Sequence, residues 1–333
     1  MNVSIIIPCY NSAKTITALV RSVLEQRAYA PDDELLVIDD CSTDESPALA
    51  TEAGARVITM ERNGGPSLAR NRGVAEAKHD LLVFLDSDTW LEPGALERIK
   101  SYFAKPDALM CLNGRCSDIP LRNAFGCGYK ALVEYCWHED YLRDPKPITC
   151  FNTRIGAMRR QAFQDSGGFD GRYKKAEVED YEFSYRLIRH HPIAFDGGLM
   201  VRHDFPDFRG ILKVYWIRAV KWAELFYDRR AFDGAGTTAN TALAHLLGAA
   251  FPLFLLGGLV WAWLSYLGLL LMLTFFWHER RLFKLFWQKL GFFGLLSGVA
   301  QHLLYSYVIV AGVAYGLLKA MKTKLGKLRG QTA

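Results

Sequence analysis

Uninterrupted apolar runs alternate with amphipathic stretches through the first 90 residues of the chain. The first of these runs, residues 3–7, is β-branched and closed by Pro8, and the runs at 34–38 and 81–85 are followed by Asp, which is typical of buried strands in a parallel sheet. These strands are expected at residues 3–7, 34–38, 55–59 and 81–85. Between them, helices are expected from a cap at Asn11 or Ser12 to about Gln26, and at 46–53 and 67–78. This alternation predicts a doubly wound α/β sheet.

The chain loses this regularity between residues 107 and 151, a stretch rich in aromatic residues and cysteine. We expect substrate-binding loops and edge strands there, followed by a helix over 178–190. Residues 210–229 then alternate aromatic with basic side chains at helical spacing, which favours an amphipathic helix at a membrane interface.

Two long segments near the C-terminus carry no Asp, Glu, Lys or Arg, namely residues 234–278 and 290–318. A single membrane span needs about 20 apolar residues, and Gly257-Gly258 offers a turn inside the first segment. Two or three spans are therefore expected, with three favoured, at about 239–256, 259–277 and 291–318. The domain plan is a catalytic domain (1–209), an interfacial helix (210–233), a transmembrane region (234–320) and a basic tail (321–333).

The net charge of +5 is unevenly distributed, because the segment from Glu279 onward carries +8 and the preceding residues carry −3. Basic residues beside membrane spans gain roughly 1 kcal/mol each from anionic lipids, so membrane lipids are favoured as partners over nucleic acid. Two basic groups flank the last apolar segment, and the number of spans decides which of them faces the cytosol.

The N-terminal apolar run is too short for a secretory signal, which places the catalytic domain in the cytosol, at the inner (cytoplasmic) membrane, in a multi-pass protein. The seven cysteines all lie within the first 150 residues and form no Cys-x-x-Cys pair. They are interpreted as reduced thiols in preference to a zinc site.

Acidic residues stand where buried strands end. Asp86 and Asp88 follow the run Leu81–Leu85, and residues i and i+2 of an extended chain point the same way. Two such carboxylates suit a hard divalent cation shared with phosphate oxygens. A second acidic pair, Asp39-Asp40, ends another strand, and ligands of α/β sheets bind beyond these carboxyl ends.

Four ordered motifs give the chain a specific resemblance over about residues 1–205. They are VSIIIPCYN at 3–11, VIDDCSTD at 37–44, FLDSD at 84–88 and ED at 179–180. The chain resembles the family 2 glycosyltransferases of the GT-A fold, which implies a Rossmann-like mixed sheet and a nucleotide-diphosphate sugar as donor.

The resemblance also implies roles for individual residues on the donor side. The segment with Pro8, Tyr10 and Asn11 lines the nucleotide site. Asp40, with Asp39 beside it, accepts a hydrogen bond from the base, which suits uracil. Arg70 and Asp86 complete the donor side, where Asn63-Gly64-Gly65 leads into a helix N-terminus suited to a diphosphate.

The catalytic roles implied by the family fall on Glu179 and Asp180, with Asp180 as the general base that deprotonates the acceptor hydroxyl and gives inversion. The metal, Mg²⁺ or Mn²⁺, is expected at Asp88 and Asp86, with His203 as a third ligand. His138-Glu139-Asp140 matches no motif.

The Gln-x-x-Arg-Trp motif of processive members is absent, which favours transfer of a single sugar to a lipid-linked or other membrane-associated acceptor in cell-envelope or surface glycan synthesis. Three alternatives stay open. The first is a polyprenyl-phosphate sugar synthase, whose ionised acceptor needs no base. The second is a non-catalytic nucleotide-sugar-binding scaffold, and the third is a nucleotidyltransferase, which would carry a Gly-rich basic N-terminal loop. The donor, acceptor, linkage and oligomeric state are not encoded in a readable pattern.

Overall fold

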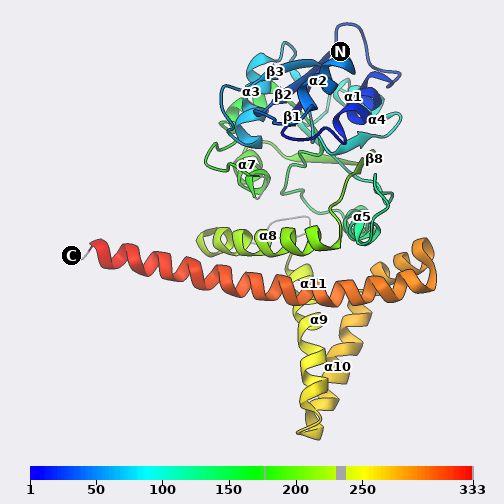
Figure 1. Ribbon diagram of the computed structural model, residues 1–333, viewed down its shortest axis with the longest axis vertical. Coiled ribbons are helices and arrows are strands. Elements are labelled where there is room, and N and C mark those ends of the chain that lie inside the picture. The colour runs from blue at the N-terminus through cyan, green and yellow to red at the C-terminus, as the bar shows by residue number, and fades with distance from the viewer. Residues whose placement is uncertain (176–177, 230–237, 332–333) are drawn as a thin grey trace. The chain divides into compact units, whose positions relative to one another are not determined.

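The computed structural model describes residues 1–175, 178–229 and 238–331. The chain forms two compact units. The first comprises residues 1–123 and 137–205, and the second comprises residues 124–136 and 206–333. Their elements are labelled in Figure 1.

The first unit is built on one eight-stranded sheet. Its strands are β1 (Val3–Cys9), β2 (Glu34–Asp39), β3 (Arg56–Thr59), β4 (Leu81–Leu85), β5 (Thr89–Leu91), β6 (Cys111–Cys116), β7 (Ile155–Arg159) and β8 (Ile193–His203). They lie in the order β3-β2-β1-β4-β7-β6-β8-β5. The strands from β3 to β4 are parallel, whereas β7 runs antiparallel to both of its neighbours. The mixed sheet predicted from the sequence is therefore confirmed.

Helices cover the sheet of the first unit. They are α1 (Ile16–Leu24), α2 (Ser46–Glu52), α3 (Pro66–Glu76), α4 (Ala95–Phe103), α6 (Arg160–Asp165) and α7 (Glu179–Leu187). Helix α1 begins later than the cap expected at Asn11 or Ser12. Asn11 has a left-handed φ of 51°, and its side chain accepts a hydrogen bond from the backbone N–H of Thr43 at 2.8 Å. It therefore shapes a turn between strands and leaves the helix to start one turn on.

The middle segment departs most from expectation. In place of loops and edge strands, it contains β6 inside the sheet and the 17-residue helix α5 (Cys127–Arg143). All six residues of β6 are buried, including Asn113 and Arg115. Asn113 donates to the carbonyl of Cys150 at 2.7 Å, and Arg115 pairs with Glu139 at 2.6 Å. These partners form the hydrogen bonds that the two buried polar side chains need. A pattern of apolar residues does not predict a buried strand that contains such side chains.

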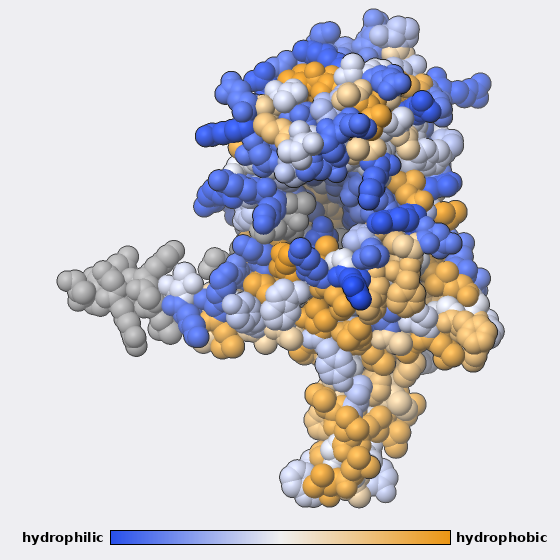
Figure 2. All heavy atoms as spheres, viewed as in Figure 1, coloured by the Kyte–Doolittle hydropathy of each residue, from blue (hydrophilic) through white to orange (hydrophobic). Residues whose placement is uncertain are grey.

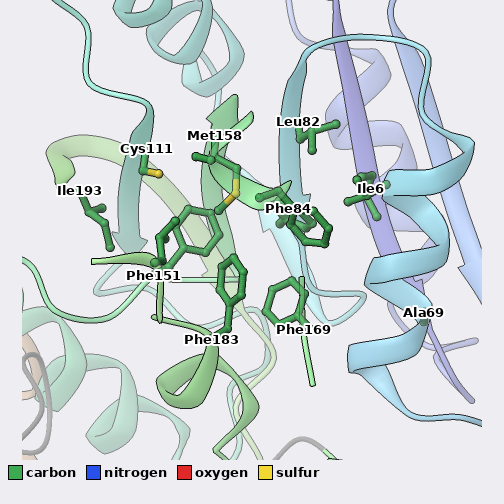
Figure 3. Close-up of a cluster of buried hydrophobic side chains, with 14 of the residues drawn as sticks. Ile6, Ala69, Leu82, Phe84, Cys111, Phe151, Met158, Phe169, Phe183 and Ile193 are labelled. Atoms are coloured by element: carbon green, nitrogen blue, oxygen red, sulfur yellow. The ribbon is translucent and has the colours of Figure 1, made fainter. Parts of the chain in front are cut away.

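The core of the first unit contains a cluster of phenylalanines (Figure 3). Phe84 of β4 contacts three of its members, Phe151, Phe163 and Phe169, at centroid distances of 5.9 to 6.2 Å. Phe183 of α7 stacks on Phe169 at 4.3 Å. Aromatic contacts of this kind contribute about 0.5–1.5 kcal/mol each beyond the burial of area. They fix α7 and the end of β4 against one core.

The second unit is helical beyond α5. It contains α8 (Phe208–Arg229), α9 (Ala239–Gly257), α10 (Ala262–His278) and α11 (Arg280–Gln331), which is broken by non-helical backbone at Gly291. Helix α9 and residues 280–323 are long and apolar enough to cross a membrane, and α10 is a shorter apolar helix. Residues 230–233 of the expected interfacial helix and 332–333 of the expected basic tail lie outside the described residues.

Candidate active site

The predicted donor residues gather where parallel strands end. Strands β1, β2 and β4 are neighbours in the sheet. Asp39 ends β2, Tyr10 follows β1, and Asp86 follows β4. Because parallel strands expose their carboxyl ends along one edge, these residues share the edge where α/β folds bind ligands. Tyr10 is 52% exposed there, whereas Pro8 is buried within β1.

Asp88 and His203 are brought together by strand pairing. Thr89 of β5 lies opposite His203 of β8 in an antiparallel register, and the N–H of Asp204 donates to the carbonyl of Asp88 at 2.8 Å. As a result, Nε2 of His203 lies 3.3 Å from Oδ1 of Asp88. Burial raises the pKa of the Asp88 carboxyl, but its interactions with His203, Arg154 and a backbone N–H together outweigh burial, so that the pKa lies below its ordinary value.

The donor atoms of this pair fit a divalent cation. Oδ1 of Asp88 is buried without a hydrogen-bond partner among the described residues, and it faces Nε2 of His203. Nδ1 of His203 lies across the ring from Nε2, so an ion bound at Oδ1 would use Nε2. A buried lone pair without a partner is unfavourable unless a ligand or ion completes it. Residues 1–175, 178–229 and 238–331 contain no group of three potential metal ligands. A cation held here would therefore take its other ligands from water and substrate phosphates, as Mg²⁺-type ions do.

Arg70 links the two acidic motifs below the surface. The side chain leaves α3, is 2% exposed, and donates to Asp86 at 2.7 Å and to Glu179 at 3.3 Å. It also donates to Thr153 at 3.1 Å and lies over the ring of Phe169. Burial lowers the pKa of the guanidinium, but these carboxylates outweigh it and raise the pKa. Arg70 and Glu179 thus form a buried ion pair that positions Asp86.

Asp180 is the second residue of α7 and directly follows the buried Glu179. One of its carboxylate oxygens accepts a hydrogen bond from the N–H of Tyr181 at 2.9 Å. Asp180 is partly buried, and its charge contributes to the raised pKa of Arg70. The structure therefore brings Asp180 into the electrostatic surroundings of the Asp86–Arg70–Glu179 chain.

The carboxylate of Asp40 binds the glycine loop. One oxygen accepts the N–H of Gly64 at 2.7 Å, and the other accepts the N–H of Gly65 at 2.8 Å. Asp40 is 3% exposed. Neighbouring Asp39 accepts the N–H of Ser42 at 3.1 Å. Asp40 thus fixes the loop before α3, a structural role that the sequence analysis did not assign to it.

Gly65 sits against the segment that precedes α7. Its φ is +84°, and a Cβ placed on it would lie 2.5 Å from the carbonyl oxygen of Lys174. Only glycine satisfies both the left-handed conformation and this close approach.

Residues outside the predicted set also shape the site. Ser87, between the two aspartates, shares a hydrogen bond of 2.7 Å with Ser12, and its carbonyl accepts from Thr15 at 2.8 Å. Thr153 binds Arg70. Of these residues, only Ser87 stands in a recognisable motif, the Asp-x-Asp triplet. No pattern in the sequence connects Ser12, Thr15 or Thr153 with the site. The His138-Glu139-Asp140 triplet lies elsewhere, with His138 stacked on Phe195 at 5.6 Å.

Residues 4–167 match the profile of Glycosyl transferase family 2. The chain belongs to this family. Among its relatives, the succinoglycan biosynthesis protein ExoO of Rhizobium meliloti is 38% identical over 101 residues, covering 29% of this chain and 28% of ExoO. A pre-mycofactocin glycosyltransferase of Mycobacterium tuberculosis is 28% identical over 275 residues, covering 79% of this chain and 52% of that protein. The chain therefore spans about half the length of the mycofactocin relative and less than a third of the length of ExoO.

A solved structure supports the fold assignment. The mannosyltransferase PcManGT of Pyrobaculum calidifontis, determined in complex with GDP-Man and Mn²⁺, superposes with a TM-score of 0.57. The superposition covers 96% of the present chain and 87% of PcManGT, at 16% sequence identity. The GT-A fold implied by the sequence motifs is thus shared with that enzyme.

Proposed function

We propose that this family 2 protein is an inverting glycosyltransferase that moves a single sugar from a nucleotide-diphosphate sugar, preferably a UDP-sugar, to a membrane-associated, lipid-linked acceptor. The observation that carries the proposal is the pairing of Asp88 with His203, where the unpartnered Oδ1 of Asp88 faces Nε2 of His203 just after Asp86 at the ligand-binding edge of the sheet. ExoO is named for succinoglycan biosynthesis, which favours a role in cell-envelope or surface glycan synthesis for this chain as well.

In this proposal Asp88 and His203 would hold a Mg²⁺ or Mn²⁺ ion, while Asp86, two residues earlier, is bound by Arg70. When bound, such an ion supplies charge neutralisation to a diphosphate leaving group. Tyr10, Asn11 and Asp39 line the nucleotide pocket.

Asp180 is the proposed general base. It accepts the proton of the acceptor hydroxyl as that oxygen attacks the anomeric carbon from the face opposite the leaving group, which inverts the configuration. Glu179 is bound to Arg70, which suits a positioning role.

The acceptor is proposed to be membrane-associated because the second unit exposes large apolar side chains at the turn between α9 and α10. Leu259 is 85% exposed, and Trp261 is 62% exposed. In the space-filling view, the surface of the two helices beside this turn is mostly apolar (Figure 2). Such a surface is expected to face lipid, so we place the protein at the cytosolic face of the cell membrane.

Isothermal titration of the detergent-purified protein with UDP and with GDP tests the donor site. Each nucleotide is titrated with Mn²⁺ and with EDTA, against Asp88→Ala and the exposed control Asp165→Ala. We expect metal-dependent binding of one nucleotide, lost in Asp88→Ala and retained in Asp165→Ala. Absence of binding under every condition would overturn the catalytic proposal in favour of a scaffold.

A further inference from the structure

Helices α8 and α11 run side by side in the same direction (Figure 1). Near the start of α8, the ring of Tyr215 meets that of Tyr305 at 5.2 Å. Further along both helices, Nζ of Lys319 lies 2.6 Å from Oε1 of Glu224. The later part of α11 therefore follows α8 over about four turns.

Small residues let the two helices approach closely. Gly312 and Gly316 of α11 face Ala219 and Ala223 of α8, and a Cβ on Gly316 would lie 2.5 Å from the carbonyl oxygen of Val220. Spacing of small residues by four on both helices is typical of tightly packed helix pairs. The pairing thus has an extended, close-packed interface.

Helix α8 is too charged to enter hydrocarbon. Its 22 residues include five Lys or Arg and two Asp or Glu, and Arg209, Lys213 and Arg218 are exposed. Charged side chains at the centre of a bilayer are unfavourable unless they are paired or face water. Because α11 packs along α8, its apolar residues from 305 to 318 are held at the level of α8.

The α9–α10 hairpin has the opposite character. It carries no Asp, Glu, Lys or Arg between Ala239 and His278, and α9 alone, with 19 residues, is about 28 Å long at 1.5 Å per residue, close to the thickness of a hydrocarbon layer. Trp261 in its turn and Trp263 in the first turn of α10 are exposed, and tryptophan favours the membrane–water interface. Helix α11 meets α9 near the beginning of α9, where His245 lies 3.0 Å from Ser306, so that α11 crosses the open end of the hairpin (Figure 1).

We propose that the α9–α10 hairpin is the one part of the described chain that crosses the hydrocarbon layer, and that α8 and α11 lie together along one membrane surface against phospholipid headgroups. This inference rests on the membrane association proposed above. It replaces the third span expected at 291–318 with an interfacial helix. Consequently, the basic residues 280–289 and those from Lys319 onward lie on the same side of the membrane, and the turn at Val260 lies on the other.

Cysteine labelling in sealed vesicles tests this topology. Lys284→Cys, Lys322→Cys and Val260→Cys are made one at a time in a background where the two partly exposed cysteines, Cys41 and Cys150, are serine. Right-side-out and inverted vesicles are then treated with a membrane-impermeant maleimide. The unsubstituted background measures labelling of the native thiols, and nucleotide binding checks that each variant is folded.

We expect positions 284 and 322 to be labelled from one side and position 260 from the other. Labelling of 284 and 322 from opposite sides would overturn the proposal in favour of three spans. Failure to label 260 from the far side would show that the hairpin does not cross. Release of the chain from membranes by alkaline carbonate would instead overturn the membrane association itself, and nucleotide binding would be untouched by that outcome.

Discussion

Nε2 of His203 lies 3.3 Å from Oδ1 of Asp88 because the strand after Asp88 pairs with the strand that ends at His203. Their separation is set by the register of β5 against β8. A backbone ladder therefore presets the two side chains before any ligand arrives. Preorganised ligands of this kind lower the ordering cost of binding.

Replacing His203 by alanine is expected to weaken Mn²⁺-dependent nucleotide binding by about tenfold or more, because changes even in the outer shell of metal sites cost on the order of 10- to 100-fold in affinity. Titration with Mn²⁺ and UDP measures the change. His191→Ala is the matched control, since His191 pairs with Asp165 at the surface. Equal affinities in the two variants would remove His203 from the metal site.

Asp180→Asn is expected to lower turnover by a factor on the order of 10² to 10⁴, the usual contribution of a general base, while nucleotide binding is retained. Sugar transfer to a hydroxyl acceptor is the measurement, and Asp165→Asn serves as control. A full rate in Asp180→Asn would remove Asp180 as the general base. Transfer by that variant to a polyprenyl phosphate, with none to a hydroxyl acceptor in either protein, would favour the polyprenyl-phosphate alternative, whose acceptor is already ionised.

Arg70→Ala is expected to lower the free energy of unfolding by about 3–5 kcal/mol, because it removes the positive charge from a buried ion pair with Glu179. The Glu179 side chain is 6% exposed. Arg72 on the same helix is exposed and pairs with Glu76, so Arg72→Ala should change stability by only about 0.5 kcal/mol or less. Thermal unfolding in detergent distinguishes the two, and equal transitions would show that the Arg70 network is not stabilising.

Gly316→Leu is expected to separate α11 from α8, because the added side chain meets the Val220 carbonyl. Ala314→Leu adds similar bulk at an exposed position of α11 and should have no such effect. Tryptic cleavage after Lys319 in membranes reports the separation and should accelerate only in Gly316→Leu. Identical cleavage rates would contradict close packing of this helix pair.

The strands around the site were predictable because central parallel strands are buried on both faces. The runs at 3–7, 34–38 and 81–85 are continuous in apolar residues, and each strand was placed within two residues of its observed bounds. Strand β6 was missed for the complementary reason. Asn113 and Arg115 are polar, and their burial depends on partners distant in sequence.

The candidate site shows the same division. The acidic residues after strands were located from sequence because topology collects strand ends. The burial of Arg70 could not be predicted from the sequence, because its partner Glu179 lies far along the chain and no local pattern connects them. Likewise, the hydrogen bonds that Asp40 accepts from two glycine amides depend on a turn whose path the sequence does not specify.

Gly65 lies against Lys174, so the glycine loop before α3 contacts the segment that leads into the proposed base, Asp180. Any side chain at position 65 would displace that segment. Donor preference and acceptor preference are therefore expected to evolve together in this lineage: a loop remodelled for a new nucleotide sugar must preserve the glycine or be accompanied by changes before α7. Exchange of this loop alone for one without the glycine is expected to yield inactive chimaeras, whereas exchange of both segments together should preserve turnover.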